Sequence, residues 1–403
     1  MQSFFLRGKK LLPIVQGGMG VGVSAHRLAG TVAAHGALGT ISSVDLRRHH
    51  EDLMDPATQP KDKEHKKADI NHKNLIALDR EVRNARALSQ GRGAIAVNVM
   101  KAVTAYPDYV RQACESGADA IVVGAGLPLD LPELTRDFPE VALIPILSDA
   151  RGVRVVLRRW ARAKTLPDAI VIENPNYAAG HLGVTDAQAI DSRVYAFAAV
   201  IAQVREVLQS MGIAPDSIPI IAAGGIHQPE QVKELLELGA SAVQLGSAFA
   251  VTRECDAHDN FKKVMAEATA DDIVTFNSVV GIPARAVRTP WLDAYLHKEE
   301  KLQSVAQERP CTEGWDCLSF CGLRDGQAKA GQFCINRQLV YALQGDVDRG
   351  LFFRSSEPLP FGSAIRSVTE LFEYLLSALP DTLRNFTQLA NRHLRHQLSD
   401  ITE

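Results

Sequence analysis

His181 is the residue in this sequence whose type and setting best suit proton-transfer chemistry. It lies in the run 176–183 (NYAAGHLG), just after the apolar segment 168–172, so it falls in a loop that follows a strand. Histidine has the side chain whose ordinary pKa lies nearest neutrality, and it can therefore give or take a proton near pH 7. The small neighbours leave room for a flat cofactor or a substrate. A loop histidine that only caps a turn is an equally good interpretation of this segment taken alone.

A second candidate site is formed by four of the six cysteines, which crowd into a short stretch. They are separated by five, three and twelve residues: Cys311, Cys317, Cys321 and Cys334. In a reducing compartment such thiols bind zinc or an iron–sulfur cluster rather than form disulfides. The spacing lacks the C-x₂-C pairs usual in zinc sites, so it favours an iron–sulfur cluster, with zinc or unligated core thiols as alternatives. Cys114 and Cys255 stand alone, and we expect them to pack as small apolar residues.

Two glycine-rich turns late in the chain are suited to binding a phosphate group. Gly224-Gly225 and Gly246-Ser247 each follow a short apolar run. Glycines let backbone N–H groups face an anion, and the start of a following helix adds the positive end of its dipole. Turns after consecutive late strands are where (β/α)₈ barrels bind phosphate.

The fold is indicated by apolar runs that alternate with segments of helical periodicity. Most of these runs are apolar throughout, as strands buried on both faces are. The eight runs are 12–16, 37–42, 94–98, 120–123, 143–147, 169–172, 218–223 and 242–245. Eight such units predict an α/β protein with a (β/α)₈ TIM barrel, in which chemistry sits at the carboxyl ends of the strands. The alternative is an open dinucleotide-binding fold, based on residues 20–25 (GVGVSA) and Asp45; it is weaker because chance matches are common among 29 glycines.

The composition is that of an ordinary globular protein. Of 403 residues, 46% are hydrophobic and 23% are charged, and the net charge of −3 gives no global attraction to nucleic acid or to a membrane surface. No apolar run is long enough for a transmembrane helix, and the first residues do not follow the signal-peptide pattern. We therefore expect a cytoplasmic protein that binds neither nucleic acid nor membranes.

Two parts of the chain fall outside the barrel pattern. We expect the barrel to span residues 1–294, with 47–75 as a charged surface insertion that carries little core. Residues 295–403 are expected to form a cysteine-rich, mostly helical extension. Within it, 369–376 and 382–398 have the pattern of amphipathic helices.

The chain resembles the nitronate monooxygenase (2-nitropropane dioxygenase) superfamily of FMN-dependent barrels. The resemblance covers residues 10 to about 290 and rests on five segments: 13–20 (PIVQGGMG), 96–100 (AVNVM), 179–183 (AGHLG), 221–226 (IAAGGI) and 244–249 (QLGSAF). It implies that His181 is the catalytic acid or base, and that Asn98 hydrogen-bonds the flavin ring. The remaining FMN contacts that it implies come from the ring loop, the histidine motif and the phosphate turns: Gly18, Met19, Gly20, Gly180, Gly224, Gly225, Gly246 and Ser247. The family commonly has two glycines before the histidine, whereas this chain has Ala179 and Gly180.

The cysteine-rich region narrows the resemblance. Together with residues 344–351 (QGDVDRGL), it is similar to a FabX-type subgroup of decanoyl-acyl-carrier-protein dehydrogenase/isomerases. That similarity implies a [4Fe-4S] cluster held by the four clustered cysteines, and a role in introducing a double bond during unsaturated fatty acid synthesis. One imidazole could take an α-proton in the oxidation and move a proton between carbons in the isomerisation. The same site could deprotonate a nitroalkane, so a nitronate monooxygenase with a structural tail remains the alternative, and a flavin-bearing redox sensor is a third.

An acyl carrier protein is acidic and would need a basic surface on which to dock. Arg154, Arg158 and Arg162 repeat at intervals of four residues, so on a helix they share one face. A partner protein would explain this grouping of like charges. A solvated barrel helix explains it as well, because the exteriors of such barrels are usually charged. We also expect the chain to be able to form a homodimer.

Overall fold

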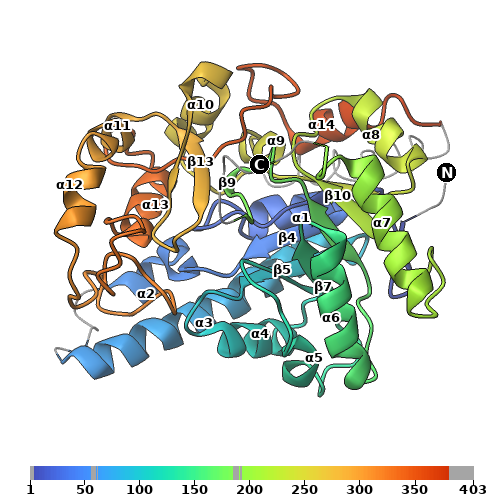
Figure 1. Cartoon of the computed structure of the whole chain (residues 1–403), viewed down its shortest axis with the longest axis horizontal. Coiled ribbons are helices and arrows are strands. Elements are labelled where there is room, and N and C mark those ends of the chain that lie inside the picture. Colours follow the sequence, from blue (N-terminus) through green and yellow to red (C-terminus); the bar gives the residue numbers. More distant parts are fainter. Residues whose placement is uncertain (1–3, 56–59, 61, 185–189, 191–192, 381–403) are drawn as a thin grey trace, which may run out of the picture.

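Eight parallel strands close into a barrel in the computed structural model, which describes residues 4–55, 60, 62–184, 190 and 193–380 (Figure 1). Around the barrel the strands follow the order β10-β11-β3-β4-β5-β6-β7-β8. Their bounds are β3 (Ile14–Gln16), β4 (Leu38–Ser42), β5 (Ala94–Met100), β6 (Ala120–Gly124), β7 (Ala142–Leu147), β8 (Ile170–Glu173), β10 (Ile220–Ala223) and β11 (Ala242–Leu245). This arrangement confirms the (β/α)₈ prediction. It rules out the open dinucleotide fold, and Asp45 is instead buried against Arg47 and Arg48.

The strands form because each is apolar on both of its faces. Side chains such as Val15, Ala96 and Ile144 fill the barrel, while their neighbours pack outward against the helices. A short hairpin of β1 (Phe4–Leu6) and β2 (Lys9–Leu11) adds Phe4 and Leu11 to the same inner cluster. It therefore closes the end of the barrel at which the strands begin.

Helices connect the strands and cover the outside of the barrel. They are α1 (His26–Ala34), α3 (Lys63–Ser89), α4 (Tyr106–Glu115), α5 (Leu131–Leu134), α6 (Ala150–Arg162), α7 (Phe197–Ser210), α8 (Pro229–Glu237) and α9 (Ser247–Ala250). In α6, Asp149 caps the first turn by accepting a hydrogen bond from the Gly152 amide. Val153, Leu157 and Trp160 lie on its buried face, which leaves the arginines of the helix exposed.

The segment 47–75 is more structured than its charged sequence suggested. It continues η1 (Leu46–His49), forms α2 (Glu51–Met54) and supplies the first half of α3. Ile70 and Asn74 are buried, and Arg47 is 4% exposed. The segment therefore contributes core contacts to the outer layer of the barrel.

The chain beyond β11 wraps the mouth of the barrel. A three-stranded sheet joins β12 (Ile273–Asn277), β13 (Pro283–Val287) and the short β9 (Gly180–His181). The remaining elements are α10 (Asp259–Glu267), η3 (Ala270–Asp272), α11 (Pro290–Leu296), α12 (Glu299–Ser304), α13 (Ile335–Leu343) and α14 (Val368–Leu375). Figure 1 shows α12 and α13 on the side of α2 and α3, whereas α14 packs on α8 and α9.

The expected helix at 369–376 is thus observed as α14, one residue displaced. The one at 382–398 lies outside the described residues. None of the described helices is both long enough and apolar enough to span a bilayer.

Candidate functional site

His181 is positioned by a strand pairing that joins two distant parts of the chain. In β9 it lies opposite Ala284 of β13, and the Leu182 amide donates to the carbonyl of Pro283. Gly180 has a φ of +64°, a conformation that side chains with a Cβ rarely adopt. The ring of Phe353 lies 5.7 Å from the imidazole, measured between centroids. Glycine at position 180 thus allows the backbone to turn beside the ring of Phe353.

The partner of the imidazole is Ser278, whose Oγ lies 2.6 Å from His181 Nε2. Ser278 is fully buried. The surrounding protein removes water from the ring and lowers the pKa of His181 to about 4. The ring is therefore neutral at pH 7. When Nε2–H donates to Ser278, Nδ1 keeps a lone pair that can accept a proton from a substrate.

Glu173 is close in sequence to the histidine, but no hydrogen bond joins the two side chains in the described part of the chain. It ends β8 and lines the cavities described below, and burial raises its pKa to about 7. The sequence did not indicate Ser278, which is separated from His181 by 97 positions and lies in no motif. Only the pairing of β9 with β13 brings the two side chains together.

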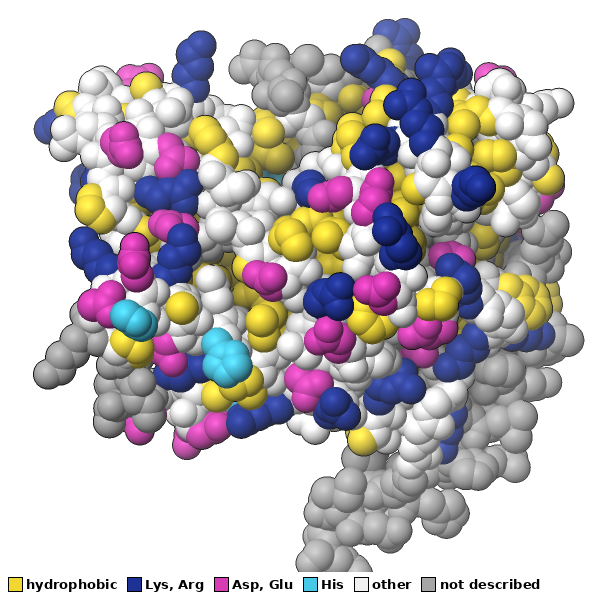
Figure 2. Space-filling view, turned by 90° about the horizontal axis from the view of Figure 1, so that it is seen from below, with side chains coloured by type: hydrophobic (Ala, Val, Ile, Leu, Met, Phe, Trp, Pro, Cys, Tyr) yellow, Lys and Arg dark blue, Asp and Glu magenta, His cyan; other side chains and the backbone are white. Residues whose placement is uncertain are grey.

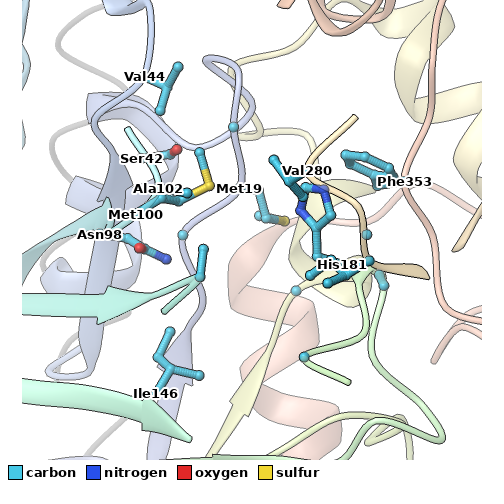
Figure 3. A pocket seen from close by; sticks show the side chains of 18 of the residues that line it. Met19, Ser42, Val44, Asn98, Met100, Ala102, Ile146, His181, Val280 and Phe353 are labelled. Atoms are coloured by element: carbon cyan, nitrogen blue, oxygen red, sulfur yellow. The ribbon is translucent and has the colours of Figure 1, made fainter. Parts of the chain in front are cut away.

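A cavity of about 750 Å³ opens at the carboxyl ends of the strands, with His181 in its wall. Figure 3 shows His181 on one side and Ser42, Asn98 and Met100 across from it. The residues predicted from the sequence to contact the flavin ring, together with the late glycine turn, line this cavity: Gly18, Met19, Gly20, Asn98, Gly180, Gly246 and Ser247. The structure therefore brings together predicted residues from the ends of four barrel strands, β3, β5, β8 and β11.

A smaller cavity of about 140 Å³ adjoins the first. Its walls include both predicted phosphate turns, Gly224-Gly225 and Gly246-Ser247. Gly18 and Met19 line both cavities. One elongated molecule could therefore lie across them, with an anionic end at the turns and a flat ring near His181.

The residues present fit FMN. Asn98 Oδ1 is buried, and no described residue donates a hydrogen bond to it, so the atom is free to accept one from a flavin ring. A Cβ on Gly18 would lie 2.4 Å from Asn98 Cβ, so the ring loop can approach that strand only as glycine. The glycine turns leave backbone amides free of side-chain cover where an anion would lie.

Gly225→Ala should weaken FMN binding by tenfold or more, because two effects coincide at the phosphate turn. Gly225 has a φ of +75°, and an added Cβ would lie 2.8 Å from the ring of Tyr177. Gly212→Ala is the matched control, since Gly212 has a φ of +74° but an added Cβ would meet nothing within 4 Å. Equilibrium titration with FMN measures the effect; equal affinities in the two variants would contradict it.

The four clustered cysteines line one small pocket next to the main cavity. Cys317, Leu318 and Ile335 belong to the walls of both. Burial, followed by the charges of the other three thiols, raises the pKa of Cys317 well above its ordinary value. No three His, Cys, Asp or Glu side chains of the described chain are placed to hold a single metal ion. The two isolated cysteines, Cys114 and Cys255, are buried, as expected.

The wall between the cysteine pocket and the barrel contains a buried polar contact. Cys334 precedes α13, and Asn336 in the first turn of that helix donates a hydrogen bond to Asp45. Asp45 also pairs with Arg47 and Arg48. These two cations, together with the hydrogen bond from Asn336, hold the pKa of Asp45 below its usual range despite burial. The contact fixes the extension against the loop that follows β4.

Comparisons with known proteins identify the family of the chain. The sequence model of the nitronate monooxygenase family matches residues 6–375. The probable nitronate monooxygenase of Bacillus subtilis is 27% identical over 299 residues, which cover 73% of this chain and 81% of that protein. The probable nitronate monooxygenase of Staphylococcus saprophyticus is 24% identical over 316 residues, which cover 74% and 80%.

Solved structures share the fold at lower identity. FabK from Thermotoga maritima has a TM-score of 0.62 and 22% identity, covering 94% of this chain and 96% of that one. Nitroalkane oxidase from Streptomyces ansochromogenes has a TM-score of 0.61 and 19% identity, covering 93% and 97%. At these identities the likeness concerns the fold.

Proposed function

Because the chain belongs to the nitronate monooxygenase family, a family of FMN-dependent oxidoreductases, we propose that it is an acyl-carrier-protein dehydrogenase/isomerase. It would introduce a double bond into a medium-chain acyl group for unsaturated fatty acid synthesis. The observation that carries this proposal is a neutral imidazole, His181, in the wall of a large and mainly apolar cavity. An alkyl thioester needs such a wall, because its reacting carbons carry no charge before a proton leaves.

The role of the protein in this reaction is to hold the substrate and move protons. Bound FMN, gripped at Gly225 and Gly246 and bordered by Asn98, would supply the hydride acceptor. His181 Nδ1 would take the α-proton while hydride leaves the β-carbon. In the isomerisation the same nitrogen would take a proton from one carbon and return it to another. Ser278 keeps the ring in the orientation that this exchange requires.

The pH dependence should reveal the low pKa of His181. A base works only when unprotonated, and because burial lowers this pKa to about 4, the ring stays active well below the range of an ordinary histidine. In a plot of kcat/KM against pH, the acid limb of the FMN-loaded enzyme should therefore lie near pH 4 rather than near pH 6.5. The Glu173→Gln variant, which removes the neighbouring carboxyl, should keep that limb. An acid limb near pH 6.5 in both proteins would show that the histidine is solvated.

An iron–sulfur cluster is proposed at the four-cysteine pocket. Support comes from the position of all four thiols around one space, with Cys317 partly buried against the core. Thiolates are the usual ligands of [4Fe-4S] clusters, and Cys311, Cys317, Cys321 and Cys334 would hold one here. Because Cys317 lies in the walls of both cavities, a cluster would lie close to the flavin ring.

Acyl carrier protein is proposed as the partner, with α6 as its docking helix. Arg154, Arg158 and Arg162 are exposed, and no carboxylate in the described part of the chain pairs with them. Most other surface arginines do have such a partner, as Arg80 has in Asp52. Figure 2 shows a gathering of Lys and Arg side chains on one part of the lower face. A row of unpaired cations suits an acidic protein surface.

The second candidate is a nitronate monooxygenase, which the names of the curated relatives favour. The two activities are separated by one comparison on the FMN-loaded protein. A saturated medium-chain acyl-carrier-protein should yield an unsaturated product, detected by mass spectrometry, with little oxygen uptake on alkyl nitronates. Rapid oxygen uptake on nitronates with no unsaturated acyl product would replace the proposal with the alternative.

A further inference from the structure

The inner end of the main cavity has features that neither the flavin nor the proton transfer uses. We infer that it binds the tail of a straight alkyl chain, and that Met265 and Phe261 of α10 set the length of chain that fits. This inference rests on the proposed function only in identifying the chain with the acyl group of the substrate.

The cavity has an exposed end and a buried end. Leu127 and Phe320 line it and are each 39% exposed, so they mark the side that opens to solvent. Met265 and Ala342 line it too, yet each is 1% exposed. His181 and the residues that border the flavin also line this cavity. A substrate that enters past Leu127 can therefore react near His181 and extend its far end towards α10.

The buried end has only apolar side chains to offer. Five apolar residues that line the cavity pack together in one buried cluster at this end: Val23, Ala250, Phe261, Met265 and Ala342. None of these carries a charge or a hydrogen-bonding side chain. Such a surface gains from the burial of methyl and methylene groups and gives no partner to a carboxylate, a phosphate or an amide. The ligand class that fits is a saturated hydrocarbon tail.

The buried end of the main cavity is closed because α10 packs against the C-terminal part of the chain, which contains Leu343 and Phe352. Phe261 and Met265 are four residues apart, so they share one face of the helix. Behind them the ring of Phe261 lies 5.5 Å from that of Phe352, and Leu343 completes the same buried cluster. Rigid packing behind the wall fixes where a chain must stop, while the flexible Met265 side chain determines the last stretch of free space.

A homologous series of ligands tests the inference in the FMN-loaded protein. The probes are saturated straight-chain acyl thioesters of N-acetylcysteamine, lengthened one methylene at a time. Affinity is read from the change in flavin absorbance on titration in a His181→Gln background, in which turnover of the probes, and with it the bleaching of the flavin, is suppressed. Each methylene that becomes buried should strengthen binding by up to about fourfold, until the chain reaches Met265 and the gain stops. The chain length at which the gain in affinity stops is called the break. Met265→Phe should move the break to a shorter chain, and Met265→Ala should move it to a longer one.

Controls keep the test decisive. Lys263→Phe places the same ring on the exposed side of α10 and should leave the break where it is. If Met265→Phe does not fold, Ala342→Val narrows the same end from α13 and should shorten the preferred chain. A break at one chain length in the wild type and in every folded Met265 and Ala342 variant would overturn the inference.

The outcome is separable from that of the proposed function. Length-dependent binding that shifts with Met265, in a protein that does not desaturate acyl-carrier-protein, supports the alkyl site and removes the proposed function. Desaturation of acyl-carrier-protein, with the same preferred chain length in wild type and Met265 variants, supports the proposed function and removes the alkyl site.

Discussion

His181→Gln should lower the rate of acyl-carrier-protein oxidation by about 100- to 10,000-fold, the range contributed by a positioned general base. Glutamine keeps a polar side chain of similar reach but cannot take up a proton at any pH at which the protein is folded. FMN should bind as before, because the phosphate turns lie on other strands. The rate is best followed as flavin bleaching in a single anaerobic turnover, which isolates the chemical step from reoxidation.

Ser278→Ala is the companion variant. Its side chain touches the imidazole and not the main cavity, so its loss should misorient the ring rather than remove the base. We expect a loss of about tenfold, well below the loss in His181→Gln. If His181→Gln retained more than half of the wild-type rate, another group such as Glu173 would have to be the base.

Cys317→Ser should abolish the bound iron and loosen the extension. Cys317 is the proposed ligand most closely shared with the main cavity, and a cluster that loses one thiolate of four is held far less firmly. Because ligand binding energy at such sites is also folding energy, the loss should cost several kcal/mol of stability. Iron and sulfide analysis of freshly purified protein measures the first effect, and thermal unfolding measures the second.

Cys114→Ser provides the matched control for this change. Cys114 is a buried cysteine of α4 that does not line the pocket of the other four. It should keep its iron and lose only modest stability. Wild-type protein without iron, and with four readily alkylated thiols in the cysteine-rich region, would instead identify these residues as unligated thiols.

The barrel could be predicted from the sequence because its strands are local. A run such as 94–100 is apolar on both faces whatever follows it, so its burial is visible in the order of residues. The loop histidine and the late glycine turns could be found for the same reason. The glycine turns directly follow such runs and the histidine lies in the loop after another, and the carboxyl ends of parallel barrel strands meet at one face.

Contacts between distant segments could not be predicted in this way. The pairing of β9 with β13, and with it the Ser278 partner of His181, depends on the path of the chain after β11. The burial of residues near 47–75 is not visible in the sequence, because a segment this charged has the composition of a solvated surface. Arg47 is buried because Asp45 and the turn around it satisfy its charge, and that pairing has no signature in a single sequence.

FMN binding is the claim on which the rest depends, and one titration tests it. Purified protein, stripped of any cofactor and titrated with FMN, should bind one FMN per chain, and Gly225→Ala should weaken this binding while Gly212→Ala does not. A protein that stays colourless with added FMN, or that binds it equally well in both variants, would contradict the assignment of the glycine turns and the cavity beside His181.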